Sequence, residues 1–380
     1  METETKMARV LILGGGFSGV VAAESLAKEL GDGHQITLVS RSGQFLFYPA
    51  LVRLAFGQCE PDDVSFDLRR SMLNRRITFI EGEVARINAD DREVIIAHGD
   101  VSGTIPYDYL IFALGRRLAT ERVTGFFEHA HHLLDLNGAL KFGEAVRNFQ
   151  GGRVIIGQCP GARLPVPVYE SAFALARWLD ENSDREKTTI TIINPGPPGS
   201  EFDDSKLTEL LAASLEKRRI EYLPNLQVSR VTSSTVITDD GRQLDYNLLM
   251  LLPPFRGPSV ASRLGITSGD DYINVDWNMK VIGLDRMYAA GDCVNLSGPK
   301  MGDLAVHQGE VAAANLAAEI AGHPPLVHYD HDLMTVIEID GESIYFHKDL
   351  WTNEPSSIRH GRFWGWAKRI HDQYWRATHQ

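Results

Sequence analysis

Residues 8–19 read Ala-Arg-Val-Leu-Ile-Leu-Gly-Gly-Gly-Phe-Ser-Gly. The apolar run predicts a buried strand, and Gly14, Gly16 and Gly19 then fit the spacing G-x-G-x-x-G before a helical pattern at 20–30. This order begins a dinucleotide-binding βαβ unit. Gly14 permits the tight turn, Gly16 lets backbone N–H groups approach a pyrophosphate, and Gly19 lets helix and strand pack closely.

The composition is that of an ordinary globular protein. The 380 residues are 43% hydrophobic and 23% charged, which is enough for two domains with real cores. A net charge of -12 argues against nucleic acid as a partner. The three cysteines lack metal-ligand spacing, so no metal site is predicted. With no apolar run of about 18 residues, we expect a cytoplasmic chain that is soluble or attached to a membrane surface.

The second strand, at 36–39, ends in Ser40 and Arg41 instead of the acidic residue that usually holds a nicotinamide ribose. A hydroxyl can still bond a ribose, so the fold prediction survives this departure. Farther on, 107–115 predicts a strand ending in Ala113-Leu114-Gly115. Small residues in this turn would let the backbone pass close to a cofactor. The alternative is an ordinary turn from a strand into a loop, with no ligand.

A second unit starts near residue 152, with a strand at 153–156, a helix at about 168–179 and a strand at 188–193. Its turn contains Cys159 in place of the second glycine, and Pro160 follows. A pyrophosphate cannot lie closely against such a turn. We therefore expect a domain with the shape of a nicotinamide-binding domain that has lost its ligand.

The stretch 286–303 contains a short strand that runs into Gly291-Asp292, and then Lys300 and Gly302. Asp303 is expected to cap a helix that continues to about Ala321.

The last residues differ in character from the rest of the chain. On a helix, an apolar face is flanked by Trp364 and Trp375, and 359–380 holds five Lys or Arg against one Asp. The apolar face consists of Phe363, Trp366, Ala367, Ile370 and Tyr374. A basic, tryptophan-rich amphipathic helix suits a membrane interface. The alternative is a helix docked on the protein or on a partner subunit, such as a second copy of the chain.

Three motifs follow one another along the chain: the glycine turn at 14–19, Ala113-Leu114-Gly115, and Ala290-Gly291-Asp292. Their order resembles that of the pyridine nucleotide-disulfide oxidoreductase superfamily. The resemblance implies an α/β fold with two Rossmann-like domains and FAD as cofactor. It implies an FAD-binding domain at 1–112 and 265–325, a second Rossmann-like domain at 113–264, and a C-terminal membrane-interface region at 326–380. The FAD-binding residues that it implies are Gly14, Gly16, Phe17, Ser18, Gly19, Ser40, Arg41, Val84, Ala113, Gly115, Gly291, Asp292 and Gly302.

Within the superfamily, the chain is most similar to sulfide:quinone oxidoreductases, and it is also similar to type II NADH dehydrogenases. The first branch uses two redox cysteines; Cys159 matches one, and the other should fall near Leu333 or Met334, where none is present. The resemblance makes Cys159 and Lys300 the candidate catalytic residues, and for Cys159 the alternative is a plain buried residue of the turn. Lys300 would bond a flavin edge or a quinone oxygen, unless it is a solvated surface lysine.

Two further residues, His307 and Gln308, are candidates for a quinone site, with packing in the core as the alternative. Cys293, inside the Gly-Asp motif, is expected to be structural.

The sequence thus predicts an FAD-dependent oxidoreductase, peripheral on the membrane, that passes electrons from sulfide or a related small reductant to quinone. One alternative is an NADH:quinone dehydrogenase. The other is a flavin-binding subunit or sensor without turnover.

Overall fold

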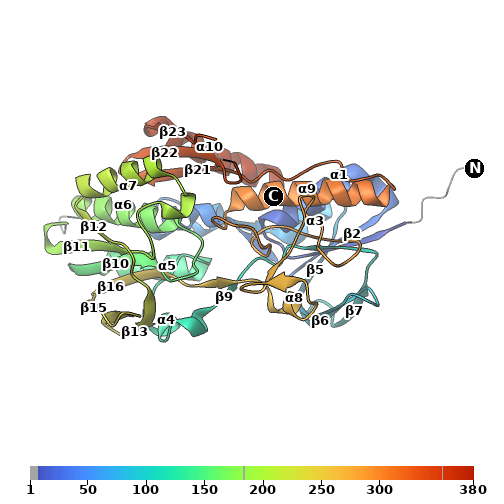
Figure 1. Ribbon diagram of the computed structural model, residues 1–380, viewed down its shortest axis with the longest axis horizontal. Helices are drawn as coiled ribbons and strands as arrows, with labels where there is room; N and C mark the ends of the chain where they lie inside the picture. Colours follow the sequence, from blue (N-terminus) through green and yellow to red (C-terminus); the bar gives the residue numbers. More distant parts are fainter. Residues whose placement is uncertain (1–6, 183–184, 353) are drawn as a thin grey trace, which may run out of the picture.

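The computed structural model describes residues 7–182, 185–352 and 354–380. Figure 1 shows two α/β halves side by side, with the last part of the chain lying across both. The predicted fold class, two Rossmann-like units and a C-terminal helix, is confirmed.

The first half is built on a seven-stranded sheet with the order β20-β8-β1-β2-β5-β6-β7. Its strands are β1 (Arg9–Leu13), β2 (Gln35–Ser40), β5 (Thr78–Asn88), β6 (Glu93–Gly99), β7 (Gly103–Pro106), β8 (Tyr109–Phe112) and β20 (Met287–Ala289). The pairs β1–β2, β1–β8, β2–β5 and β20–β8 are parallel. Parallel strands that are covered on both faces are apolar along their whole length. The buried apolar residues of β1 and β8 follow this pattern.

The second half has a four-stranded parallel sheet with the order β12-β11-β10-β16. These strands are β10 (Gly152–Gln158), β11 (Thr188–Ile193), β12 (Ile220–Leu223) and β16 (Leu248–Leu252). A small antiparallel sheet of β13 (Val228–Val231), β14 (Thr235–Thr238) and β15 (Gln243–Asp245) flanks it. The halves are also joined by β9 (Arg117–Leu118) pairing with β17 (Phe255–Arg256). The other two-stranded pairs are β3 (Gln44–Leu46) with β4 (Ser65–Asp67), and β18 (Thr267–Ser268) with β19 (Tyr272–Ile273).

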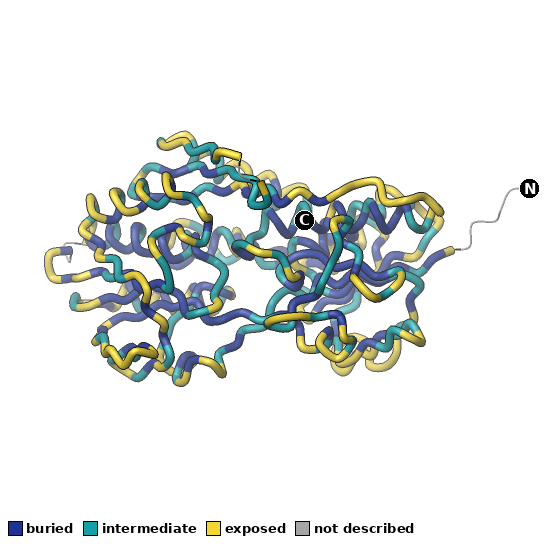
Figure 2. The backbone as a smooth tube through the Cα atoms, in the orientation of Figure 1, coloured by how far each residue is buried: buried dark blue, intermediate teal, exposed yellow. Residues whose placement is uncertain are grey.

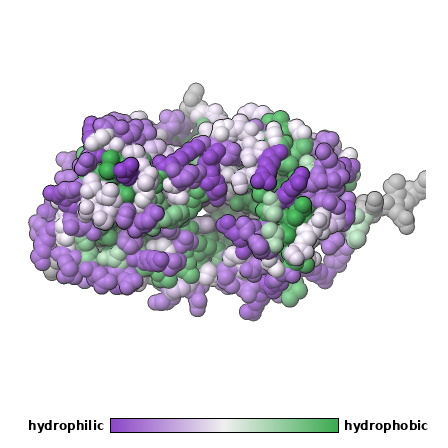
Figure 3. Space-filling view, turned by 90° about the horizontal axis from the view of Figure 1, so that it is seen from below, coloured by the Kyte–Doolittle hydropathy of each residue, from purple (hydrophilic) through white to green (hydrophobic). Residues whose placement is uncertain are grey.

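The helices cover these sheets. They are α1 (Phe17–Leu30), α2 (Leu51–Ala55), α3 (Leu68–Asn74), α4 (Phe126–His129), α5 (Leu136–Arg147), α6 (Val166–Glu181), α7 (Ser205–Lys217), α8 (Ser259–Ser262), α9 (Gly302–Ile320) and α10 (Arg362–His379). The central strands and the inner faces of α1, α6 and α9 are buried (Figure 2). The face away from α10 is hollowed between the halves, with apolar side chains visible in the hollow (Figure 3).

Residues 332–360 form an antiparallel sheet that the sequence analysis did not predict. Strands β21 (Asp332–Ile339), β22 (Glu342–Asp349) and β23 (Ser357–His360) pair in sequence order. Burial alternates along β21, which is the pattern of a strand with one covered face. This sheet carries α10 across α6 and α1 (Figure 1).

The C-terminal helix docks on the protein through its polar side and Trp375. Lys368 pairs with Glu170 (2.6 Å), and Asp372 pairs with Arg53 (2.7 Å). The Trp375 ring packs against Phe17, with the ring centroids 4.8 Å apart. The predicted apolar stripe faces outward instead, because Phe363, Trp366, Ile370 and Tyr374 are exposed. No helix of the described residues is long and apolar enough to cross a membrane.

We expect Trp375→Ala to lower the free energy of unfolding by about 3–5 kcal/mol, because it opens a cavity among buried aromatic rings. Trp366→Ala is the matched control, since Trp366 lies on the same helix but is 60% exposed, and its effect should stay within about 0.5 kcal/mol. Chemical denaturation measures both. Equal effects would contradict the docked orientation of α10.

Candidate dinucleotide site

The glycine turn after β1 is held by close backbone contacts. The Gly14 N–H donates to the Val39 carbonyl (2.7 Å), and the Ala113 N–H donates to the Leu13 carbonyl (2.8 Å). A Cβ at Gly14 would lie 2.0 Å from the Ala113 carbonyl oxygen, and one at Gly19 would lie 1.8 Å from the Gly14 oxygen. Gly14 has φ +116°, which also favours glycine. The structure therefore brings Ala113 to the glycine turn.

The Gly-Asp segment meets the same turn. The Ser18 hydroxyl donates to the Ala290 carbonyl (3.2 Å), and the Ala290 N–H donates to the Phe112 carbonyl (2.9 Å). A Cβ at Gly291 would lie 2.4 Å from Ser18 Oγ. Three turns that are far apart in the sequence thus converge at the N-terminus of α1.

Space for a ligand lies beside these turns. A Cβ at Gly16 or at Gly115 would meet no atom of the described residues within 4 Å, although both glycines stand next to closely packed backbone. The first N–H groups of α1 have no partners within the helix, and its dipole favours negative charge there. The negative charge of a dinucleotide pyrophosphate therefore suits this space beside Gly16 and Gly115, which we term the cradle. Direct contact between the glycine turn and the pyrophosphate of FAD remains a prediction.

The remaining predicted FAD residues lie at the end of β2, on β5 and at the start of α9. Ser40 is buried at the end of β2, where its Oγ would lie 2.7 Å from a Cβ at Gly15. Arg41 is exposed directly after β2, and Val84 is half-buried on β5. The Phe17 ring packs on Gly302, at the start of α9, where a Cβ would lie 3.3 Å from the ring.

Arg116 is a site residue that the sequence analysis missed. Its guanidinium pairs with the Asp292 carboxylate and lies over the Phe255 ring, 4.2 Å from the centroid. Its buried Nε has no hydrogen-bond partner among the described residues. Arg116 immediately follows Gly115, so a cation directly after the small-residue turn was the available signal. The carboxylate of Asp292, one of the predicted FAD-binding residues, is thus held by a cation at the edge of the cradle.

Lys300 is buried, which makes the solvated alternative wrong. Its Nζ donates to the Val294 carbonyl (2.5 Å) and lies 4.6 Å from the Tyr272 ring centroid. Burial and the nearby Arg163 lower the pKa of Lys300 to about 7. Lys300 therefore changes its charge near neutral pH.

Gln308 belongs to a buried hydrogen-bond network. Its Oε1 accepts from the Gly291 N–H (2.8 Å), and its Nε2 donates to the Tyr329 hydroxyl (3.0 Å). Tyr329 contacts His331 Nδ1 (2.8 Å), whose Nε2 contacts the Ser297 carbonyl (3.0 Å). Gln308 is therefore packed in the core, which was the alternative to a quinone site, and it holds the Gly-Asp turn in place. The His307 ring packs on Tyr329, with the centroids 5.1 Å apart.

The start of α9 corrects one local prediction. The cap residue is Met301, and Asp303 lies inside the first turn. The Asp303 carboxylate accepts from the Met334 N–H (3.4 Å), so it ties β21 to the helix start instead of capping it. Burial raises the pKa of Asp303. The place of the missing second cysteine, at Leu333 or Met334, therefore adjoins the N-terminus of α9.

Cys159 lies in an apolar cluster of the second half, among residues that include Ile155, Ile193 and Val123. It is fully buried, and burial raises the pKa of its thiol. A nucleophilic cysteine needs its thiolate, which this environment disfavours. The catalytic role predicted for Cys159 is therefore not supported by its placement. Cys293 is also fully buried, with its Sγ 3.4 Å from the Phe112 carbonyl oxygen, in keeping with a structural role.

The turn after β10 is closed by protein groups. The Arg163 guanidinium donates to the Gly298 carbonyl and to the Leu296 carbonyl, and the Lys300 N–H donates to the Arg163 carbonyl (2.6 Å). At the end of β11, where a ribose-binding carboxylate usually stands, Asn194 instead donates to Glu201 (2.7 Å). The turn after β10 is thus tied to 296–300 of the first half, and the side chain of Asn194 is occupied by Glu201.

The fold and the glycine cradle define a protein with two dinucleotide-binding folds. The chain belongs to the pyridine nucleotide-disulphide oxidoreductase family, whose model matches residues 8–314. A sulfide-quinone reductase of Aquifex aeolicus is 29% identical over 268 residues, which are 67% of this chain and 60% of that protein. A type II NADH:quinone oxidoreductase of Haemophilus influenzae is 24% identical over 76% of this chain and 74% of its own length.

The solved structures agree on the fold. The crystal structure of the sulfide:quinone oxidoreductase from Aquifex aeolicus superposes with a TM-score of 0.91 at 22% identity, covering 97% of this chain and 90% of that one. At this identity, the likeness shows the fold alone.

We expect Gly16→Val to fold normally but to purify without FAD, because the new side chain would enter the open space that we assign to the cofactor. Gly19→Val is the contrasting variant: its Cβ would clash with the Gly14 oxygen, so the fold itself should fail. Visible absorbance and the thermal midpoint separate the two effects. A yellow Gly16→Val protein with full FAD content would refute the assignment of this turn.

Lys300 should make stability depend on pH in the FAD-free protein. Its pKa is about 7 when folded and 10.5 when unfolded, so between these values the unfolded chain holds a proton that the folded chain lacks. Stability from this group therefore rises with pH through that window. In urea unfolding at several pH values from 7 to 10, wild type should gain stability relative to Lys300→Met. Parallel curves would contradict the low pKa.

Proposed function

We propose that the chain is an FAD-dependent oxidoreductase that passes an electron pair from sulfide or a related small reductant to quinone. Its family membership and the cradle beside Gly16 support FAD as the cofactor. When bound, FAD can take up two electrons together and release them singly, which suits a quinone acceptor.

The residues of the chain would act by binding and by charge. The N-terminus of α1 would hold the pyrophosphate, and the Arg116–Asp292 pair would fix the edge of the cradle. The N-terminus of α9 would favour negative charge on the bound ring system. Lys300, whose pKa is about 7, would hold or release a proton near neutral pH.

One observation favours a small donor over a nicotinamide dinucleotide: the turn after β10 is closed by hydrogen bonds to other parts of the protein. Arg163 bridges this turn to 296–298, and Asn194 is occupied by Glu201. A nicotinamide dinucleotide would need both places for its phosphates and ribose. A donor the size of sulfide needs neither.

Nicotinamide oxidation is the second candidate. It is favoured by relatives such as the type II NADH:quinone oxidoreductases of Haemophilus influenzae and Staphylococcus species. Those two matches cover 74% and 90% of the relatives' lengths, whereas the match to the Aquifex sulfide-quinone reductase covers 60% of that protein. A third candidate is a flavin-binding subunit or sensor without turnover.

We also propose that the outward face of α10 rests on a membrane. Phe363, Trp366, Ile370 and Tyr374 recur along one side of the helix and are 43–69% exposed. Four large apolar side chains in one stripe are costly in water and suit the interface of a bilayer. We retain the division into a discontinuous FAD domain, a second domain at 113–264 and a membrane-interface region at 326–380.

The donor is tested by anaerobic titration of the FAD-loaded protein. We expect sulfide to bleach the flavin absorbance and NADH to leave it unchanged, because the second domain is closed to a dinucleotide. Bleaching by NADH alone would favour the second candidate, and bleaching by neither would favour the third. Either result would contradict the proposal.

Cys159→Ala is the control for sulfur capture by the thiol. Because Cys159 is fully buried in an apolar cluster, we expect the variant to keep its FAD and its rate of bleaching by sulfide within about threefold. A loss of bleaching with FAD retained would restore the catalytic role predicted from the sequence.

A further inference from the structure

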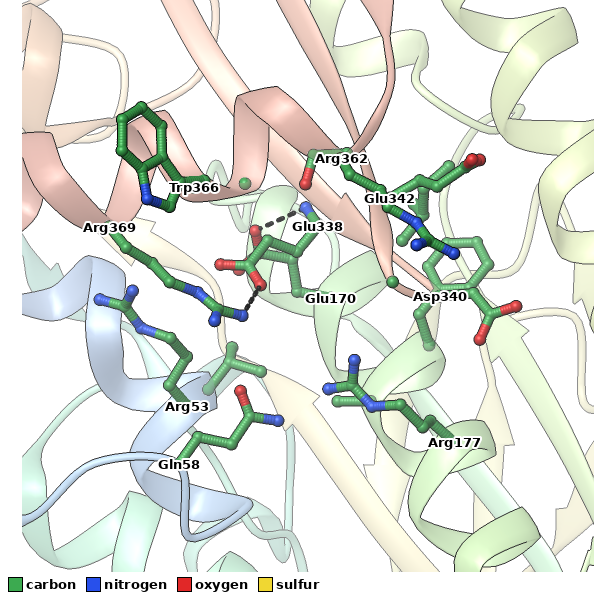
Figure 4. A pocket seen from close by; sticks show the side chains of 17 residues that line it. Arg53, Gln58, Glu170, Arg177, Glu338, Asp340, Glu342, Arg362, Trp366 and Arg369 are labelled. Carbon is green, nitrogen blue, oxygen red and sulfur yellow. Dashed lines mark hydrogen bonds and ion pairs between the residues drawn. The ribbon is translucent and has the colours of Figure 1, made fainter.

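A pocket of about 190 Å³ lies beneath α10, away from the dinucleotide cradle. The pocket is partly open and is lined by the first half of α10, by α6, by the turn between β21 and β22, and by residues of α2 (Figure 4). This volume is several times the roughly 30 Å³ that one water occupies in the liquid, so a small polar group has room to enter.

The carboxylates that line the pocket are already paired. The pairs are Glu170 with Lys368 (2.6 Å), Glu338 with Arg369 (3.4 Å), Asp340 with Arg218 (3.4 Å) and Glu342 with His360 (3.1 Å). Among the lining cations, Arg53 is also paired, with Asp372 (2.7 Å). The negative charge of the lining is therefore largely neutralised by the protein itself.

Two lining arginines remain. Among the described residues, no carboxylate oxygen lies within 4.0 Å of the guanidinium of Arg177 on α6 or of Arg362 at the start of α10, and neither side chain donates a hydrogen bond. Figure 4 shows their side chains extending toward the pocket from opposite sides. Two planar guanidinium groups facing one space form a binding arrangement for an oxyanion, and a phosphate suits it best.

The position of the pocket indicates the source of that phosphate. Trp366 lines the pocket and also belongs to the exposed stripe of α10. A bilayer that meets this stripe would place its headgroup layer at the pocket, because interfacial tryptophans sit at headgroup level. We propose that Arg177 and Arg362 bind the phosphodiester of an anionic phospholipid headgroup, an inference that rests on the proposed membrane face.

The test uses the full-length, FAD-loaded protein and a short-chain phosphatidylglycerol below its micelle concentration, with binding followed by phosphorus NMR. We expect saturable binding that Arg177→Gln/Arg362→Gln weakens by about tenfold or more, because two charge-assisted contacts are lost. The matched control is Arg359→Gln/Arg376→Gln, which removes the same amount of positive charge at two positions outside the pocket. It should stay within about twofold of wild type.

Inorganic phosphate in place of the lipid distinguishes the two sources. We expect it to bind about tenfold more weakly than the lipid, since it gains no apolar contact with the stripe. Phosphate binding as tight as lipid binding would overturn the lipid assignment. Equal lipid binding by wild type and Arg177→Gln/Arg362→Gln, with FAD content and thermal midpoint unchanged, would overturn the site.

Vesicle flotation separates this inference from the membrane proposal. The short-chain lipid is monomeric and needs no membrane surface to bind. If wild type floats with phosphatidylglycerol vesicles and Trp366→Ala/Tyr374→Ala does not, the membrane face stands, even where the lipid titration has overturned the pocket. If wild type binds the monomeric lipid through Arg177 and Arg362 but does not float, the membrane face fails while the phosphate site is supported.

Discussion

The contact between α1 and β1 is the constraint on which the site depends. A Cβ at Gly19 would lie 1.8 Å from the Gly14 oxygen, so only glycine lets this helix come so close to the strand. The approach points the first N–H groups of α1 into the space beside Gly16. It also allows Ser18 to reach Ala290, which joins the first βαβ unit to a segment 272 positions later in the chain. The same close packing therefore holds the core together and shapes the cradle.

The C-terminal helix presents an unusual division of its faces. Its buried side carries ion pairs, with Lys368 on Glu170 and Asp372 on Arg53, while most of its large apolar side chains point outward. Burying charges is tolerable here because each has a partner. Trp375 is the apolar exception, and it packs on Phe17 within the glycine turn. The helix thus links the FAD turn to the surface that we propose meets the membrane.

The sequence was sufficient to predict the fold class, because glycine spacing and apolar runs are local signals. That the three turns meet at one cofactor was implied by the resemblance to the family. It could not place Cys159, since burial depends on how β10 packs against distant strands. It also missed the sheet at 332–360 and the pair of Arg116 with Asp292, a contact across 176 positions. For the C-terminal helix, helical spacing identified the apolar stripe, but only tertiary contacts showed that the polar side is docked on the protein.

The most direct test of the central claim is the number of FAD molecules released per chain when the purified protein is denatured and its released flavin is measured by absorbance. One cradle at the N-terminus of α1 and a closed turn after β10 predict one FAD per chain and no retained nicotinamide dinucleotide. A value of zero after reconstitution with excess FAD, or a second dinucleotide bound per chain, would contradict the account.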